Sequence, residues 1–171
     1  MHNDYDHDDN SNDNSNEKYN RPKWEPRQWL VNSKYNNCYS YALDDYSVSR
    51  MQKAIPGNST STNFYSCSFI MEGLKSDHPQ MYVSSFEQPC DRGFHKIYAA
   101  TSDTDHEGFN DFHFWRQDSD GLWSHKPGSD YPLRVDGMNR IIHNPDFSNR
   151  TFGDRSYVTP CGFFCVESNI N

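Results

Sequence analysis

The sequence predicts an α+β fold in which helices near the N-terminus pack on an antiparallel sheet. Three observations predict it. Two segments in the first half space their apolar residues as helices do, and the second half alternates with a period of two. A strong turn signal then separates two of the alternating segments. The length of 171 residues favours a single domain.

Residues 1–20 are expected to form a disordered acidic arm, and residues 21–171 the folded domain. The arm holds five Asp and one Glu against one Lys, and almost nothing that could be buried. Much of the net charge of −8 therefore belongs to the arm, and the domain is only mildly acidic. No basic stripe for nucleic acid is expected, and no segment reaches the roughly 20 apolar residues of a membrane span.

The first elements are helices. Asn37 offers N-cap chemistry to a short helix expected over residues 38–46, and a second helix is expected over 69–75, ending before Pro79. Alternation then predicts strands, which form an antiparallel meander closed by a final strand. Their expected ranges are 81–86, 94–100, 111–117, 122–125 and 162–166.

The turn at residues 118–121, Asp-Ser-Asp-Gly, sets the register of the hairpin that follows. Gly121 suits the left-handed position of a three-residue loop with a bulge. In that register Trp115 pairs with His125, and His113 lies diagonally from His125 on the same face. A two-residue loop would instead send His125 to the opposite face.

Cys38, His113 and His125 are the predicted catalytic residues. Cys38 stands at the expected helix start, where free N–H groups and the helix dipole lower the pKa of a thiol. His113 would take the thiol proton to give a thiolate–imidazolium pair, and His125 would orient the imidazole above this helix. His95, which follows Gly93-Phe94, is the rival base. The structural interpretation is a buried Cys and two packed His.

The order of these features resembles that of the papain-like cysteine hydrolases. Residues 37–42, Asn-Cys-Tyr-Ser-Tyr-Ala, at a helix start precede a strand His and a polar residue on the next strand, an order most similar to NlpC-type and CHAP-type amidases and peptidases. The run 113–128 also resembles a block in small bacterial and viral proteins of this kind. The resemblance implies a papain-like core over about residues 35–166, with Cys38 as nucleophile and His113 as base. The residues usual around the nucleophile in these families are missing, so the oxyanion donor stays unnamed.

The five cysteines are expected as reduced thiols, because no apolar segment follows Met1 as a secretory signal would. The compartment stays open between a virus particle and the cytoplasm, and the oligomeric state is not predicted. Cys161 and Cys165 could bind zinc with Cys90, but zinc sites usually show two close ligand pairs. No metal or other cofactor is therefore predicted.

Two functions follow from this pattern. The first is a cysteine peptidase or amidase that cuts an amide bond in a peptide or peptidoglycan-like substrate. The second is a non-catalytic structural or interaction protein on the same fold, possessing Cys38 and His113 only as remnants and forming part of a larger assembly such as a virus particle.

Overall fold

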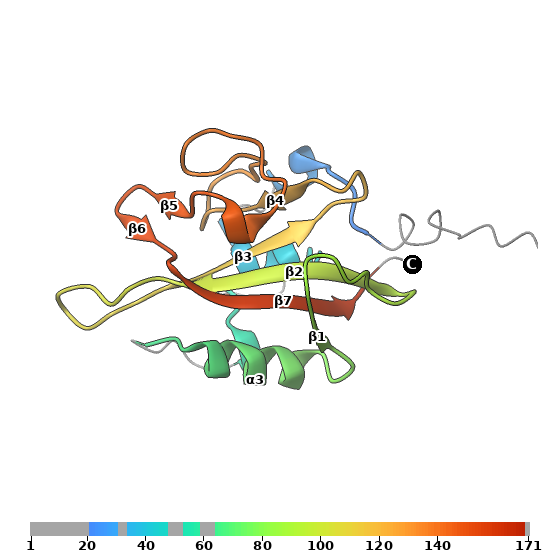
Figure 1. Ribbon diagram of the computed structural model, residues 1–171, viewed down its shortest axis with the longest axis horizontal. Helices are drawn as coiled ribbons and strands as arrows, with labels where there is room; N and C mark the ends of the chain where they lie inside the picture. The colour runs from blue at the N-terminus through green and yellow to red at the C-terminus, as the bar shows by residue number, and fades with distance from the viewer. Residues whose placement is uncertain (1–20, 31–33, 48–52, 59–63, 170–171) are drawn as a thin grey trace, which may run out of the picture.

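A five-stranded antiparallel sheet lies at the centre of the computed structural model, which describes residues 21–30, 34–47, 53–58 and 64–169 (Figure 1). The α+β class is thereby confirmed, while the expected arm over residues 1–20 lies outside the described residues. The sheet order is β1-β7-β2-β3-β4. The strands are β1 (Tyr82–Ser84), β2 (Phe94–Thr101), β3 (Phe112–Gln117), β4 (Trp123–His125) and β7 (Thr159–Glu167), and β5 (Thr151–Phe152) pairs with β6 (Arg155–Ser156) in a separate hairpin.

Two α-helices precede the sheet, as the sequence predicts. Asn37 caps α2 (Cys38–Ala42) by accepting hydrogen bonds from two backbone N–H groups of the first turn, and Ser66 caps α3 (Cys67–Asp77) by accepting one, from the N–H of Phe69. The first helix ends earlier than the expected residue 46, because Asp44 adopts a left-handed conformation with φ of 53°. Single 3₁₀ turns complete the set: η1 (Pro26–Trp29), η2 (Pro56–Asn58) and η3 (Pro145–Phe147).

The sheet separates two apolar clusters, as strand alternation requires. The helix-side core joins α2 and α3 to one face of the sheet, and α3 runs below β2 and β7 in Figure 1. It contains Cys38, Tyr39, Ala42, Leu43, Ile70, Leu74, Ile97, Ala99, Phe112, Phe114, Phe164 and Val166, with others. The loop-side core lies on the other face and consists of Tyr98, Ala100, Trp115, Trp123, Ile142, Tyr157 and Phe163.

The predicted meander is wrong in one respect. The last strand, β7, lies between β1 and β2 and pairs antiparallel with both. Its alternation explains the position, because Phe164 and Val166 enter the helix-side core while Phe163 enters the loop-side core. A strand that is apolar on both faces is stable inside a sheet and not at its edge.

The expectation of five reduced thiols is also wrong. Cys67 forms a disulfide with Cys161, and Cys90 forms one with Cys165, so that only Cys38 is a free thiol. Both disulfides end on β7, where they fasten α3 and the β1–β2 connection to this interior strand. The three sulfurs of the alternative zinc site are therefore bonded to other sulfurs.

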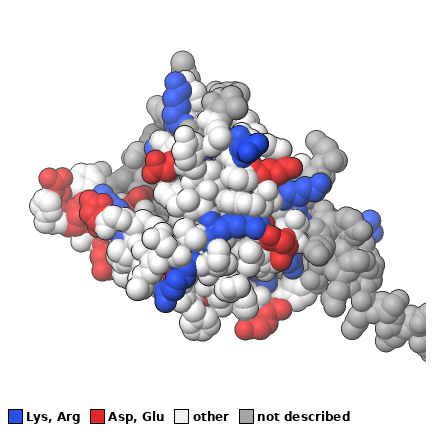
Figure 2. All heavy atoms as spheres, turned by 90° about the horizontal axis from the view of Figure 1, so that it is seen from above, with Lys and Arg blue, Asp and Glu red and all other residues white. Residues whose placement is uncertain are grey.

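Charged groups are mixed on the face that Figure 2 shows, which is the molecule seen from above the view of Figure 1. Basic and acidic side chains lie side by side there among uncharged residues. Within the part of the chain that the structure describes, no helix has the length and apolar character needed to cross a membrane.

Candidate functional site

The β3–β4 hairpin has the predicted register. Trp115 lies opposite His125, and Gly121 adopts a φ of 86° in the turn. A turn hydrogen bond of 2.9 Å runs from the N–H of Gly121 to the carbonyl of Asp118. The two imidazoles that this register brings together are in contact, with 2.8 Å between Nε2 of His113 and Nδ1 of His125.

The hydrogen bonds of this pair determine which nitrogen carries each proton. Nε2 of His125 lies 3.0 Å from the carbonyl oxygen of Val135, which can only accept, so His125 carries its proton on Nε2. Its Nδ1 is then the acceptor, and Nε2–H of His113 donates to it. The remaining nitrogen of His113, Nδ1, is left with a lone pair and has no hydrogen-bond partner in the described part of the chain.

Burial keeps both imidazoles neutral. His113 is 2% exposed and His125 is fully buried, and burial lowers the pKa of His125 to about 4. Burial, together with the neighbouring His125, also lowers the pKa of His113 well below its usual 6.5. A neutral imidazole can accept a proton during a reaction, but the imidazolium form of His113 is not favoured in the resting protein.

Aromatic rings from the β5–β6 region cover the pair. The ring of Tyr157 lies 4.9 Å from that of His113 between centroids, and the ring of Phe152 lies 4.6 Å from that of His125. Trp115 meets His113 edge-on at 4.5 Å from below. The hydrogen bond between the imidazoles is therefore shielded from water, which strengthens it.

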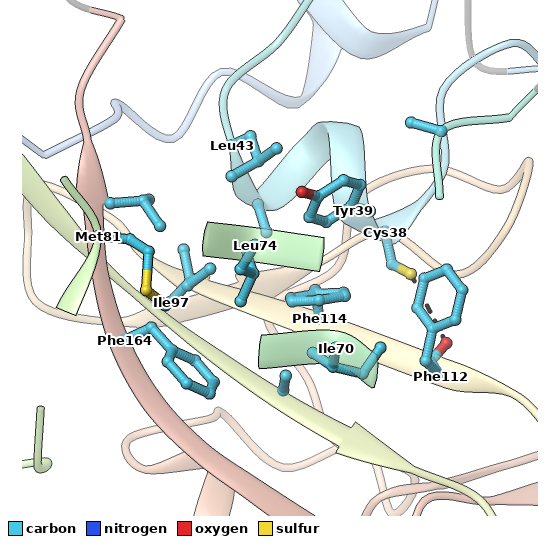
Figure 3. Close-up of a cluster of buried hydrophobic side chains, with 14 of the residues drawn as sticks. Cys38, Tyr39, Leu43, Ile70, Leu74, Met81, Ile97, Phe112, Phe114 and Phe164 are labelled. Atoms are coloured by element: carbon cyan, nitrogen blue, oxygen red, sulfur yellow. Dashed lines mark hydrogen bonds between the residues drawn. The ribbon is translucent and has the colours of Figure 1, made fainter. Parts of the chain in front are cut away.

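Cys38 reaches β3 from the other side of the sheet. Alternation turns Phe112 and Phe114 toward the helices and His113 away from them, and Cys38 belongs to the helix-side core. Its Sγ donates to the carbonyl of Phe112 at 3.8 Å, as the dashed line in Figure 3 shows. The expectation that both imidazoles lie above the helix carrying Cys38 is therefore wrong, and among the described residues no hydrogen bond links this sulfur to either ring.

The sulfur is nevertheless held against the backbone on both sides of His113. Besides the Phe112 carbonyl, the backbone of Phe114 and that of Tyr39 lie close enough to act on the thiol. Burial and then Asp111 raise the pKa of the thiol to about 12, although these two backbone groups lower it. The thiol is therefore protonated at rest, contrary to the expected thiolate–imidazolium pair.

His95, the rival base, is occupied by structural contacts. Nε2 of His95 lies 2.8 Å from the carbonyl of Ala42 at the end of α2, and Nδ1 lies 3.2 Å from Oγ of Ser168. Burial lowers the pKa of His95 to about 4. This imidazole links the end of α2 to the segment after β7, and both of its nitrogens have hydrogen-bond partners there.

Sequence reasoning missed Tyr157 and Lys126 as neighbours of Cys38, and it considered Asp111 only as an alternative third member of the triad. Tyr157 donates its hydroxyl to Asp111 at 3.0 Å, and the charge of Asp111 acts on the thiol. Lys126 brings an ammonium close enough to lower the pKa of the same thiol. Alternation past His125 could have found Lys126, because it must face the side of the sheet that His125 does not. No sequence signal points to the carbonyl of Val135, which lies in a loop.

Comparisons of the chain with known protein families, with curated proteins and with solved structures found no match.

Proposed function

We propose that this chain is a thiol hydrolase with a papain-like core, in which Cys38 attacks an amide carbonyl, His113 is the general base and His125 fixes its tautomer. The observation that carries the proposal is the chain of hydrogen bonds from His113 through His125 to the carbonyl of Val135. It leaves Nδ1 of His113 as the basic nitrogen, while the free thiol touches the backbone of the residue before it.

The raised pKa of the thiol and the lowered pKa of the base define the form of the mechanism. Nδ1 of His113 takes the thiol proton as Sγ bonds to the carbonyl carbon, so the two steps are concerted and no ion pair precedes them. The imidazolium then gives this proton to the leaving amine, and an acyl-enzyme remains on Cys38. Water, deprotonated by His113, releases the acid and restores the thiol.

For this transfer the thiol proton must leave the carbonyl of Phe112 and reach the ring of the next residue in the chain. Because the sulfur lies in the helix-side core and the His113 ring lies on the opposite face of β3, the proposal requires α2 and this part of β3 to move relative to each other, and not a side-chain rotation alone. His125 is not a proton acceptor in the reaction, because its Nε2–H donates a hydrogen bond to the carbonyl of Val135. It orients His113, as the third member of such triads does.

The proposal can be tested with p-nitrophenyl acetate, an acyl donor that needs no specific binding pocket. The disulfide-intact protein should release nitrophenolate in a burst and carry an acetyl group on Cys38, located by peptide mass spectrometry. His113→Gln should slow acetylation by at least about a hundredfold, the usual contribution of a general base. His95→Gln is the matched control, a buried imidazole outside the chain of hydrogen bonds, and should acetylate at the wild-type rate. Equal rates for His113→Gln and the wild type would refute the proposal.

The second candidate is a non-catalytic interaction domain. The observation that favours it is the burial of Cys38, which is 5% exposed and packs among apolar side chains (Figure 3). A structural thiol of this kind is inert. This second candidate predicts that Cys38→Ala changes only the stability of the protein. It also predicts that no acetyl group accumulates on Cys38 in the folded wild type.

A further inference from the structure

Lys126 is a fully buried lysine whose contacts lead to the thiol. Its Nζ donates to the carbonyl of Asn36 at 2.6 Å and to that of Gly128 at 2.7 Å. Asn36 directly precedes the N-cap of α2 and lies two positions before Cys38. An ammonium is rarely buried without a role, because removing it from water is costly.

The register of the hairpin places Lys126 on the same side of the sheet as Cys38. The last pair of the hairpin is Trp115 with His125, so the next position along β3 is Phe114, which lies in the helix-side core together with Cys38. Ser124, two residues before Lys126, also faces the helices and bonds to the hydroxyl of Tyr41 in α2 at 2.7 Å. On one face of the sheet, Ser124 contacts α2 and Lys126, directly after β4, contacts the residue before its N-cap. On the other face, His125 contacts His113.

A cation is needed here because α2 is short. A helix of five residues has little dipole to offer a thiolate, so the stabilisation expected from the helix start is largely missing. The charge of Asp111 opposes ionisation of the thiol, and the backbone groups of Phe114 and Tyr39 that favour ionisation carry no net charge. Lys126 is a cation whose charge acts on the Cys38 thiol.

We propose that Lys126 is a positioning residue for the nucleophile: its ammonium, held by two carbonyls on the helix side of β4, stabilises the negative charge that develops on Cys38 when its proton leaves. A role for Lys126 in catalysis rests on the proposed function. Its effect on the ionisation of Cys38 can be measured without turnover. Lys53 and Asp130 act in turn on Lys126, with opposite signs.

The test is the rate at which iodoacetamide alkylates Cys38 in the disulfide-intact protein, followed by mass spectrometry across pH. Below the pKa of a thiol, this rate follows the thiolate fraction, and one pKa unit changes it about tenfold. Lys126→Gln retains amide donors for the two carbonyls but loses the charge, so the rate should fall about tenfold. The matched control is Lys96→Gln, since Lys96 is a buried ammonium that donates to backbone carbonyls of the β1–β2 connection. Its alkylation rate should equal that of the wild type.

A second variant covers the case in which Lys126→Gln does not fold. Burial lowers the pKa of Lys126 to about 8, so the wild type loses this charge as pH rises further, whereas an arginine does not. Lys126→Arg should therefore alkylate faster than the wild type above this pH and at a similar rate below it. A folded Lys126→Gln variant with the wild-type profile, or identical profiles for Lys126→Arg and the wild type, would overturn the inference. Failure of the acetylation test with an intact Lys126 effect would refute the proposed function alone.

Discussion

The disulfide between Cys67 and Cys161 should supply a large part of the stability of this domain. The two cysteines are 94 residues apart in sequence. Closing a loop of that length in the unfolded chain removes entropy worth about 4.7 kcal/mol at 25 °C in the chain-entropy description. Typical domains are stable by only about 5–15 kcal/mol, so removing this one cross-link should bring the protein close to unfolding.

The perturbation is the double substitution Cys67→Ser with Cys161→Ser, measured by urea denaturation without reductant. The unfolding free energy should fall by about 3–5 kcal/mol, the lower figure allowing for residual structure in the unfolded chain. The second disulfide closes an overlapping loop of 75 residues, so the two effects should not add fully. Under reductant the variant and the wild type should become nearly equal. A loss below about 1 kcal/mol would refute the reasoning, because the cross-link would then constrain nothing.

Three further predictions concern buried groups. Burial lowers the pKa of His95 and of His125 to about 4 in the folded protein, against 6.5 in the unfolded chain. As the pH falls from 6.5 to 4 the unfolded state binds protons first, so the free energy of unfolding should decrease by about 1.4 kcal/mol per pH unit for each ring. In urea denaturation His95→Gln should reduce this slope, and a flat profile for the wild type would contradict the prediction. Arg116→Met should cost about 3–5 kcal/mol by the same assay, because it removes a buried guanidinium that pairs with Asp44 and with the buried Asp118, whose remaining ion-pair partner is Arg134. A cost near zero would mean that these ion pairs are replaceable. Gly73→Ala should lower the melting temperature, since its methyl group would lie 2.5 Å from the backbone of Pro56, and an unchanged temperature would show that η2 can move away.

Local chemistry accounts for what the sequence predicted well. The hairpin register followed from a single glycine and two alternating strands, and it placed His113 against His125 correctly. The helix caps and the approximate strand ranges were predictable for the same reason. These features depend on residues that are close in the chain, where turn geometry and side-chain period decide the outcome.

The errors concern contacts between distant segments. Nothing near Cys38 reveals that it would approach β3 from the face opposite His113, because that depends on how α2 docks. The disulfides join residues 94 and 75 positions apart, and cysteine spacing alone does not give such pairings. The position of β7 in the sheet could not be predicted either, because alternation shows that a strand is buried but not which strands it pairs with.

The position of β7 between β1 and β2 has a consequence for the order of folding. Hairpin β3–β4 and the β2–β3 pair can form from neighbouring segments, but β1 has no partner strand and β2 lacks its second one until residues 159–167 arrive between them. A chain emerging from the ribosome must therefore hold two exposed strand edges while residues 102–158 are made. Such long-range closure gives a high contact order and slow folding, and aggregation of the waiting intermediate is its characteristic risk. Once β7 has inserted, the two disulfides that end on it can form, and oxidation then makes the last folding step difficult to reverse.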